Sequence, residues 1–318
     1  MSDTLVYAAR VKDRKLLVKS SSGGAFTALS DVILSDGNAI ACGIYNYETK
    51  QVEFQLITDR ETRDTARGSK YMQSVPGNIF KKAVAWLKAN PERSFLFIGM
   101  GCQTAGFRKF AEISGFRNRV TLVDIICHGS PSPMLWQEYA EHLEEKHGEI
   151  EYLTFKDKRN GWKHPIAVAI TDKVEIPLND YVKVFYSCCA LRPACHKCPY
   201  TTINRNTDIT IGDYWGIDKV MPDFFDEKGV SMILVHSDKG KELFDRSKEF
   251  LEYRESNTTE CLQPNLIHPT VKSEMREKFW QDYHWHGMKY IMNNYGSATI
   301  QGKIKNKLKK VTGGGIAH

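Results

Sequence analysis

The chain has 318 residues, of which 42% are hydrophobic and 26% are charged, so its composition is that of a globular protein with a sizeable core. Its 44 Lys and Arg residues exceed its 38 Asp and Glu residues by six, and five of the lysines lie in 301–318, a segment without acidic residues. Because the rest of the chain is therefore close to neutral, it lacks the concentrated basic face that nucleic-acid-binding proteins need, and we exclude nucleic acid as a partner.

The sequence also bears on the cellular location. No apolar run approaches the roughly 20 residues that span a bilayer, and residues 1–15 lack the apolar core of a secretory signal. We therefore expect a cytoplasmic protein. In that reducing compartment the eight cysteines are expected to ligate metal, to act in catalysis or to be buried, rather than to form structural disulfides.

The first predicted elements are a helix and two strands. Residues 20–37 predict a serine and glycine turn followed by an amphipathic helix. Residues 38–48 and 51–58 predict strands, the second because apolar and polar residues alternate along it.

The next segment predicts a strand, helix, strand unit. Residues 94–100 and 119–127 are apolar runs of strand length, and each is followed by a turn and a helical segment. Such runs indicate parallel strands that are buried on both faces and joined by a right-handed crossover. Cys102 and Cys127 each follow one of these strands, so both are expected at the sheet edge where open α/β sheets bind ligands.

After residue 150 the pattern changes. Shorter strand candidates surround a cysteine-bearing loop at 187–200, and helices are predicted at 239–252 and 274–292. We therefore predict an α/β fold with a mostly parallel sheet and flanking helices in its N-terminal half, packed against a smaller α+β portion. The expected division is an FAD-binding portion at 1–150, a portion with the cysteine loop at 151–299 and a basic tail at 300–318. Apolar and lysine residues alternate in that tail as on a helix that contacts an anionic membrane surface, although a solvated terminus is also expected of such a segment.

Cys195 and Cys198 form a C-x-x-C motif, whose two thiolates can bind one metal centre. Alone, the motif supports zinc, a redox dithiol or an iron–sulfur cluster. Cys102 and Cys127 could complete a 4Fe–4S site, or they could be small buried residues at strand ends. Cys188 and Cys189 are adjacent, and either one could replace a ligand of this set.

Several segments resemble the beta-subunit family of coenzyme F420 hydrogenases and dehydrogenases. The matching stretches keep their order along the chain and are SSGGAFTAL (21–29), RGSKYMQS (67–74), FIGMGCQTAGFRKF (97–110), VDIICHGSPSP (123–133), FKDKRNGW (155–162), LRPACHKCPYTTINRNTDITIGDYWGI (191–217) and GVSMILV (229–235). The resemblance implies FAD and at least one 4Fe–4S cluster, with Cys102, Cys127, Cys195 and Cys198 as the cluster ligands.

The expected FAD site uses several of these motifs. Hydroxyl groups, bare backbone and a helix dipole suit a pyrophosphate at Ser21, Ser22, Gly23 and Gly24, although a serine cap with a glycine turn has the same sequence. Lys70 could neutralise phosphate or the reduced flavin ring, or be solvated, and Tyr71 could stack on a ring or pack in a core. The same motifs contribute the other expected FAD-binding residues, Ser69, Gly101, Gln103 and Gly129.

His128 follows Cys127 and is the candidate proton donor in catalysis, with a hydrogen-bonding scaffold role as the alternative. Arg192, Arg205 and Asp208 flank the cysteine loop, where they could orient it, contact FAD or form ion pairs.

The resemblance implies an FAD-dependent, 4Fe–4S-containing oxidoreductase that exchanges hydride or electrons with an organic substrate. A sugar or sugar nucleotide in surface-polysaccharide synthesis is one candidate substrate. The alternatives are a reductase or dehydrogenase of coenzyme F420 or ferredoxin, a non-catalytic electron-transfer subunit, and a zinc-stabilised binding module. Expected partners are a small-molecule substrate and a ferredoxin or reduced deazaflavin as electron donor.

Overall fold

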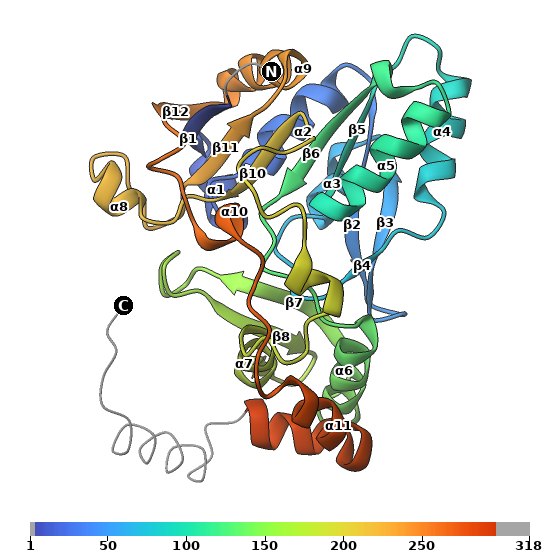
Figure 1. Ribbon diagram of the computed structural model, residues 1–318, viewed down its shortest axis with the longest axis vertical. Helices are drawn as coiled ribbons and strands as arrows, with labels where there is room; N and C mark the ends of the chain where they lie inside the picture. Colours follow the sequence, from blue (N-terminus) through green and yellow to red (C-terminus); the bar gives the residue numbers. More distant parts are fainter. Residues whose placement is uncertain (1–3, 297–318) are drawn as a thin grey trace.

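A computed structural model describes residues 4–296, and within this range nine strands form one large sheet (Figure 1). The strand order is β12-β1-β11-β10-β6-β5-β2-β3-β4. The central strands β10, β6, β5 and β2 are parallel, whereas β11, β1 and β12 continue the sheet antiparallel on one side and β3 pairs antiparallel with β2 on the other. The bounds are β1 (Leu5–Val11), β2 (Ala39–Asn46), β3 (Gln51–Ile57), β4 (Ser74–Val75), β5 (Phe95–Met100), β6 (Val120–Ile125), β10 (Ile209–Asp213), β11 (Ser231–Val235) and β12 (Leu251–Ser256).

Helices cover both faces of the parallel centre. On β5, Leu96 and Ile98 belong to the core that includes α2 and α9, while the alternate residues Phe95 and Phe97 belong to the core that includes α4 and α5. Because successive side chains of a strand point to opposite faces, this alternation explains why the strand is apolar throughout. The helices of this part are α1 (Arg14–Lys19), α2 (Ala25–Ser35), α3 (Arg60–Thr65), α4 (Ile79–Ala89), α5 (Gly101–Ile113), α8 (Ile217–Val220), α9 (Asp238–Ser247) and α10 (Pro264–Ile267).

A smaller antiparallel sheet forms the lower part of the molecule in Figure 1. Its strands are β7 (Ile150–Asp157), β8 (Ile166–Thr171) and β9 (Glu175–Pro177), and its helices are α6 (Pro133–His147), α7 (Asn179–Tyr186) and α11 (Arg276–Ile291). Trp136 of α6 and Tyr181 of α7 are fully buried in its core, with ring centroids 4.8 Å apart. Aromatic burial of this kind stabilises a small sheet that buries little surface by itself.

The predicted α/β fold class is confirmed, and so are the parallel pairing of β5 with β6 and the helix that joins them. Two boundaries differ from the prediction. Helix α5 begins at Gly101, so Cys102 lies in its first turn and not in a preceding turn. Helix α9 ends at Ser247, and a 3-10 turn at Lys248–Phe250 leads into the edge strand β12. The predicted portion at 151–299 does not form one sheet of its own, since its strands β10, β11 and β12 belong to the large sheet. The tail at 300–318 lies outside the described residues.

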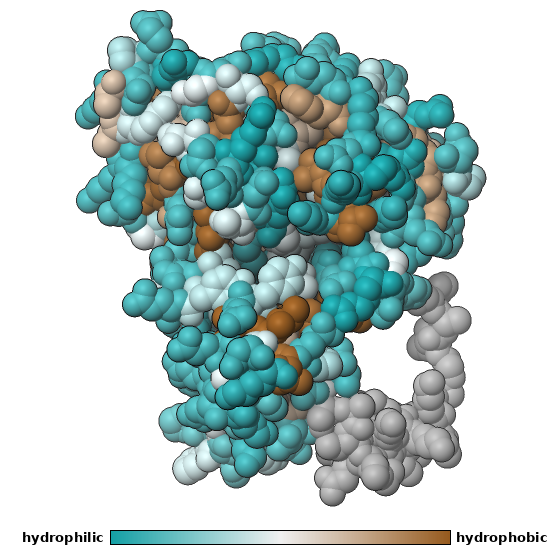
Figure 2. Space-filling model, turned by 180° about the vertical axis from the view of Figure 1, so that it is seen from behind, coloured by the Kyte–Doolittle hydropathy of each residue, from teal (hydrophilic) through white to brown (hydrophobic). Residues whose placement is uncertain are grey.

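The surface is mostly hydrophilic in the rear view of Figure 2, where hydrophobic residues show as separate patches on the upper part and just below the narrowing. Among residues 4–296, no helix combines the length and the apolar character that crossing a membrane requires.

A buried polar network joins three strands to the cysteine loop. Asp124 of β6 accepts a hydrogen bond from Thr210 of β10, whose hydroxyl lies 2.9 Å from Nε2 of His236 at the end of β11. The same carboxylate pairs with the Arg205 guanidinium at 2.9 Å, and both side chains are almost completely buried. Arg205 Nε in turn donates to the carbonyl of Thr202, just after the cysteine loop. This network fixes the loop against the carboxyl end of β6.

The turn before α2 lies directly on the sheet. Gly23 accepts a backbone hydrogen bond from Val11, and a Cβ atom at Gly23 would lie 2.2 Å from the carbonyl oxygen of Ala9 and 2.4 Å from the amide of Ser231. Ala9 and Ser231 are paired residues of β1 and β11. Only glycine allows the turn to lie this close to the two strands.

We expect Gly23→Ala to lower the free energy of unfolding by about 3 kcal/mol, because the new methyl group forces backbone apart. Gly106→Ala is the matched control in α5, since its Cβ would meet Phe80 at an ordinary 3.6 Å. That control should gain about 0.5–1 kcal/mol from helix propensity. Urea unfolding of both variants measures the difference, and equal stabilities would contradict the close packing at Gly23.

Acid should destabilise the protein through His236. Burial, helped by the nearby Arg205, lowers the pKa of His236 from 6.5 to about 4. Between these two values the unfolded chain binds a proton that the folded chain does not, so the free energy of unfolding falls as the pH falls from about 6.5 to about 4. We expect His236 to contribute about 2 kcal/mol to this loss. Urea unfolding at both ends of the window should show a smaller loss for His236→Gln than for the wild type, and an equal loss would refute the assignment.

Candidate functional site

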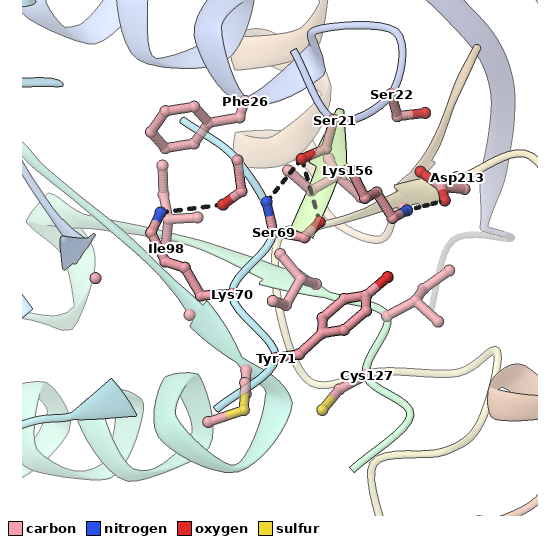
Figure 3. A pocket seen from close by; sticks show the side chains of 18 of the residues that line it. Ser21, Ser22, Phe26, Ser69, Lys70, Tyr71, Ile98, Cys127, Lys156 and Asp213 are labelled. Carbon is pink, nitrogen blue, oxygen red and sulfur yellow. Dashed lines mark hydrogen bonds and ion pairs between the residues drawn. The ribbon is translucent and has the colours of Figure 1, made fainter. Parts of the chain in front are cut away.

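A pocket lies where the carboxyl ends of β5, β6 and β10 meet the start of α2, and residues of the small sheet and α7 close it on the other side. Figure 3 shows a close view, with Ser21, Ser69 and Tyr71 on neighbouring walls. Eight of the ten predicted FAD-binding residues line the pocket: Ser21, Ser22, Gly24, Ser69, Lys70, Tyr71, Gln103 and Gly129. Gly23 and Gly101 do not belong to the lining, and both face packed backbone or side chains instead.

The serine loop presents the start of α2 to the pocket. The Ser22 hydroxyl donates to the carbonyl of Val230 at 2.8 Å, and the Ser21 hydroxyl accepts from the Ser69 amide at 2.7 Å. Both hydroxyls therefore hold the loop in place. Gly24 has a φ of +88° and, having no side chain, leaves the first N–H groups of α2 without a side-chain cap. Such groups and the helix dipole favour a negatively charged ligand.

Lys70 is held by backbone carbonyls. Its ammonium group donates to the carbonyls of Ala66 at 2.6 Å and Gly68 at 3.0 Å, so it closes the turn after α3. Burial lowers the pKa of Lys70 to about 8. Lys70 therefore lines the pocket as a half-buried group that backbone carbonyls restrain.

Gln103 and the two predicted glycines of the sheet edge have structural contacts. The Gln103 amide donates to the carbonyl and hydroxyl oxygens of Ser74, and its own oxygen accepts from the Met100 amide. A Cβ at Gly101 would lie 2.8 Å from Cβ of Tyr200, and one at Gly129 would lie 3.3 Å from Cβ of Cys195. Both glycines therefore allow the cysteine loop to approach the edge.

The four predicted cluster ligands come together from three distant segments. The pKa of the Cys127 thiol is raised to about 12, mainly by burial and in smaller part by the nearby thiols of Cys195, Cys102 and Cys198. Burial, followed by Cys198 and Cys195, also raises the pKa of Cys102. A metal centre binds cysteine as the thiolate, so metal binding would release the protons of these thiols.

Two buried polar atoms beside the cysteines have no partner within the described part of the chain: the Ser130 hydroxyl and Nε2 of His196. Ser130 follows Gly129, and His196 lies inside the C-x-x-C motif, where its Nδ1 is 2.9 Å from the Thr270 carbonyl. Buried polar atoms without partners are rare and require an explanation. In residues 4–296, no three His, Cys, Asp or Glu side chains are arranged around a single metal ion.

His128 lies at the pocket wall between the two parts. Its Nε2 is 3.5 Å from the Cys188 sulfur, its Nδ1 is 3.4 Å from the Thr270 hydroxyl, and its backbone carbonyl accepts from the same hydroxyl. Burial lowers the pKa of His128. The catalytic role of His128 stays a prediction, and the ring contacts show a firmly positioned histidine.

The charged residues near the cysteine loop form ion pairs and hydrogen bonds. Arg205 pairs with Asp124, Asp208 pairs with Arg117 at 3.3 Å, and Arg192 donates to Gln73. These contacts orient the loop and the strand that follows it. In the described part of the chain, the pocket lining does not include Arg192, Arg205 or Asp208.

Sequence reasoning did not single out three residues that line the pocket: Lys156, Asp213 and Tyr186. Lys156 and Asp213 lie inside two of the resembling motifs, which is the signal that could have identified them, and they form an ion pair in the pocket wall. Cys188 has a φ of +61°, a strained conformation for a residue with a side chain. Tyr186 has no comparable signal, since its position depends on the packing of α7.

The fold and the sequence of the chain are similar to those of known proteins. A solved structure titled "Xenon derivatization of the F420-reducing [NiFe] hydrogenase complex from Methanosarcina barkeri" contains a similar fold, with a TM-score of 0.53 and 17% identity over 97% of this chain and 92% of that chain. No curated protein matches the chain. The family model for the C terminus of the coenzyme F420 hydrogenase/dehydrogenase beta subunit matches residues 92–259, which is more than half of the chain. By this match, and by the ordered motifs of its sequence, the chain belongs to the coenzyme F420 hydrogenase/dehydrogenase beta-subunit family.

Proposed function

We propose that this member of an oxidoreductase family binds FAD in the pocket and a 4Fe–4S cluster at Cys102, Cys127, Cys195 and Cys198. The observation that carries the proposal is the convergence of these four thiols next to the pocket wall that contains Cys127. When bound, FAD exchanges hydride with an organic molecule and the cluster exchanges single electrons.

The residues fit a cluster in three ways. They supply four thiols, which is the ligand number of a 4Fe–4S centre. Because the cluster bonds each thiolate to a different iron, the four sulfur atoms need not surround a single metal ion. The partnerless Ser130 hydroxyl is suited to donate a hydrogen bond to sulfur. Gly101 and Gly129 keep side-chain atoms out of the space between the loop and the sheet edge.

The pocket suits FAD because its lining combines anion-binding groups with apolar side chains. The uncapped start of α2 and the side chains of Arg67 and Lys70 supply positive charge or N–H donors to a pyrophosphate. The apolar walls include Val52, Ile98 and Ile126, which suit a flat aromatic ring system.

The substrate is proposed to be a small organic molecule, with a sugar or sugar nucleotide as one candidate and coenzyme F420 as the other. A non-catalytic electron-transfer subunit is the second candidate function, favoured by the hydrogenase complex to which the similar solved structure belongs. In that case a protein partner, such as a ferredoxin or a second subunit, would exchange electrons with the cluster.

The ligand assignment is tested by single substitutions in the full chain, purified and reconstituted without oxygen. We expect Cys127→Ser and Cys195→Ser to lose most of their iron and the broad cluster absorption while keeping the flavin bands, because each removes one of four bonds to the cluster. Cys188→Ser is the matched control, since Cys188 contacts His128 and lies outside the four-thiol group.

Metal analysis and absorption spectra measure both cofactors. Full iron in Cys195→Ser together with lost iron in Cys188→Ser would reassign the ligand set. A colourless wild type that contains zinc would overturn the proposed function, and a protein with a cluster but no flavin would favour the electron-transfer subunit.

A further inference from the structure

Four polar side chains meet at one wall of the pocket. Tyr71 follows the turn after α3, Tyr186 ends α7, Lys156 belongs to β7 and Asp213 ends β10. All four line the pocket. They therefore bring acid–base groups from both sheets to one place.

The hydroxyl groups of Tyr71 and Tyr186 form a directed pair. The Tyr186 hydroxyl donates to the Tyr71 hydroxyl at 3.0 Å, so the hydrogen of the Tyr71 hydroxyl remains for another acceptor. Within residues 4–296, that hydrogen has no acceptor in the protein, and Figure 3 shows the Tyr71 side chain extending into the pocket. A pocket-facing donor without an internal acceptor is suited to an oxygen atom of a ligand.

Packing fixes the direction of Tyr71. Its ring stacks on Phe185 with centroids 4.6 Å apart, and it lies 5.1 Å from the ring of Phe155. The Tyr181 hydroxyl donates to the Tyr71 carbonyl at 2.9 Å, which holds the backbone. A donor held in this way loses little conformational entropy when it meets a ligand.

The charges around the pair suit proton donation. Lys156 pairs with Asp213, and the Lys156 ammonium group favours the ionised form of Tyr186 while Asp213 opposes it. Burial raises the pKa of both tyrosines, so both are protonated near neutral pH. The other titratable group that faces the pair is His128, whose ring lies 5.4 Å from that of Tyr186 and whose nitrogens contact Cys188 and Thr270.

We propose that the pocket reduces a carbonyl group, with Tyr71 donating the proton to the carbonyl oxygen and Tyr186 returning a proton to Tyr71. This assignment rests on the proposed flavin-dependent function and names the chemical class of its substrate, an aldehyde or ketone. Lys156 is a positioning residue whose ammonium group stabilises the tyrosinate that forms for the time of the transfer, and Asp213 holds Lys156 in place through their ion pair.

The step balances in atoms and electrons. The C=O π bond breaks, a C–H bond forms with hydride from the reduced flavin, and an O–H bond forms with the proton of Tyr71. The carbonyl carbon gains two electrons, the flavin loses them, and the product is an alcohol. The Tyr71 oxygen then takes the proton of the Tyr186 hydroxyl, and Tyr186, which is half exposed, takes a proton from water.

The test uses 4-(dimethylamino)cinnamaldehyde, whose absorption moves to longer wavelength when its carbonyl oxygen accepts a strong hydrogen bond. We expect the purified wild type, with its flavin content measured, to produce this red shift. Tyr71→Phe should abolish the shift and keep the flavin, because phenylalanine retains the ring that stacks on Phe185. Tyr186→Phe should reduce the shift. Tyr152→Phe is the matched control on β7, since Tyr152 is exposed and lies outside the described lining of the pocket.

A second readout is the loss of the aldehyde band after the flavin of each variant has been reduced by light. Tyr71→Phe should slow this loss by about 100-fold, as expected for removal of a general acid. A full red shift or an undiminished rate in Tyr71→Phe would overturn the Tyr71 assignment, and no shift in a flavin-loaded wild type would overturn the carbonyl assignment. A wild type that shifts the aldehyde but contains no flavin would contradict the proposed function alone and support Tyr71 as the donor.

Discussion

The buried ion pair of Asp124 and Arg205 is the interaction on which the candidate site depends. Asp124 lies at the end of the strand that leads to Cys127, and Arg205 follows the loop that carries Cys195 and Cys198. A buried charge is costly unless it is paired and hydrogen-bonded, so neither residue can leave the other without a large loss of stability. The carboxylate also accepts from Thr210, and the guanidinium also donates to Thr202. The pair therefore specifies one position of the cysteine loop on the sheet edge.

The pocket depends on both parts of the molecule. The large sheet supplies the start of α2 and the strand ends, which are the usual ligand-binding features of an open α/β sheet. The small sheet supplies Lys156, and α7 supplies Phe185 and Tyr186. Because the hydride-transfer and proton-transfer groups would come from different parts, the packing between the parts controls their alignment. The aromatic contacts of Tyr71 with Phe155 and Phe185 provide that alignment directly.

The sequence predicted the parallel pair β5 and β6 and the meeting of Cys102 with Cys127 because the carboxyl ends of neighbouring parallel strands share one edge. It predicted eight residues of the pocket lining through motifs, and the structure shows a further requirement for some of these motif residues. Ser22 and Lys70 bind backbone carbonyls, and Gly23 is needed where the turn touches β1 and β11. A motif indicates which residue type a position requires, but different physical requirements can select the same residue type.

The sequence by itself determined the local elements, the ordered motifs and the family, because hydrophobic period and residue spacing are properties of short segments. Only the tertiary structure decided that β10, β11 and β12 return to the first sheet, that the C-x-x-C loop lies beside Gly101 and Gly129, and that Tyr71 meets Tyr186. These contacts join residues that lie far apart along the chain. Their formation depends on side-chain packing and on the burial of paired charges, which no local pattern in the chain records.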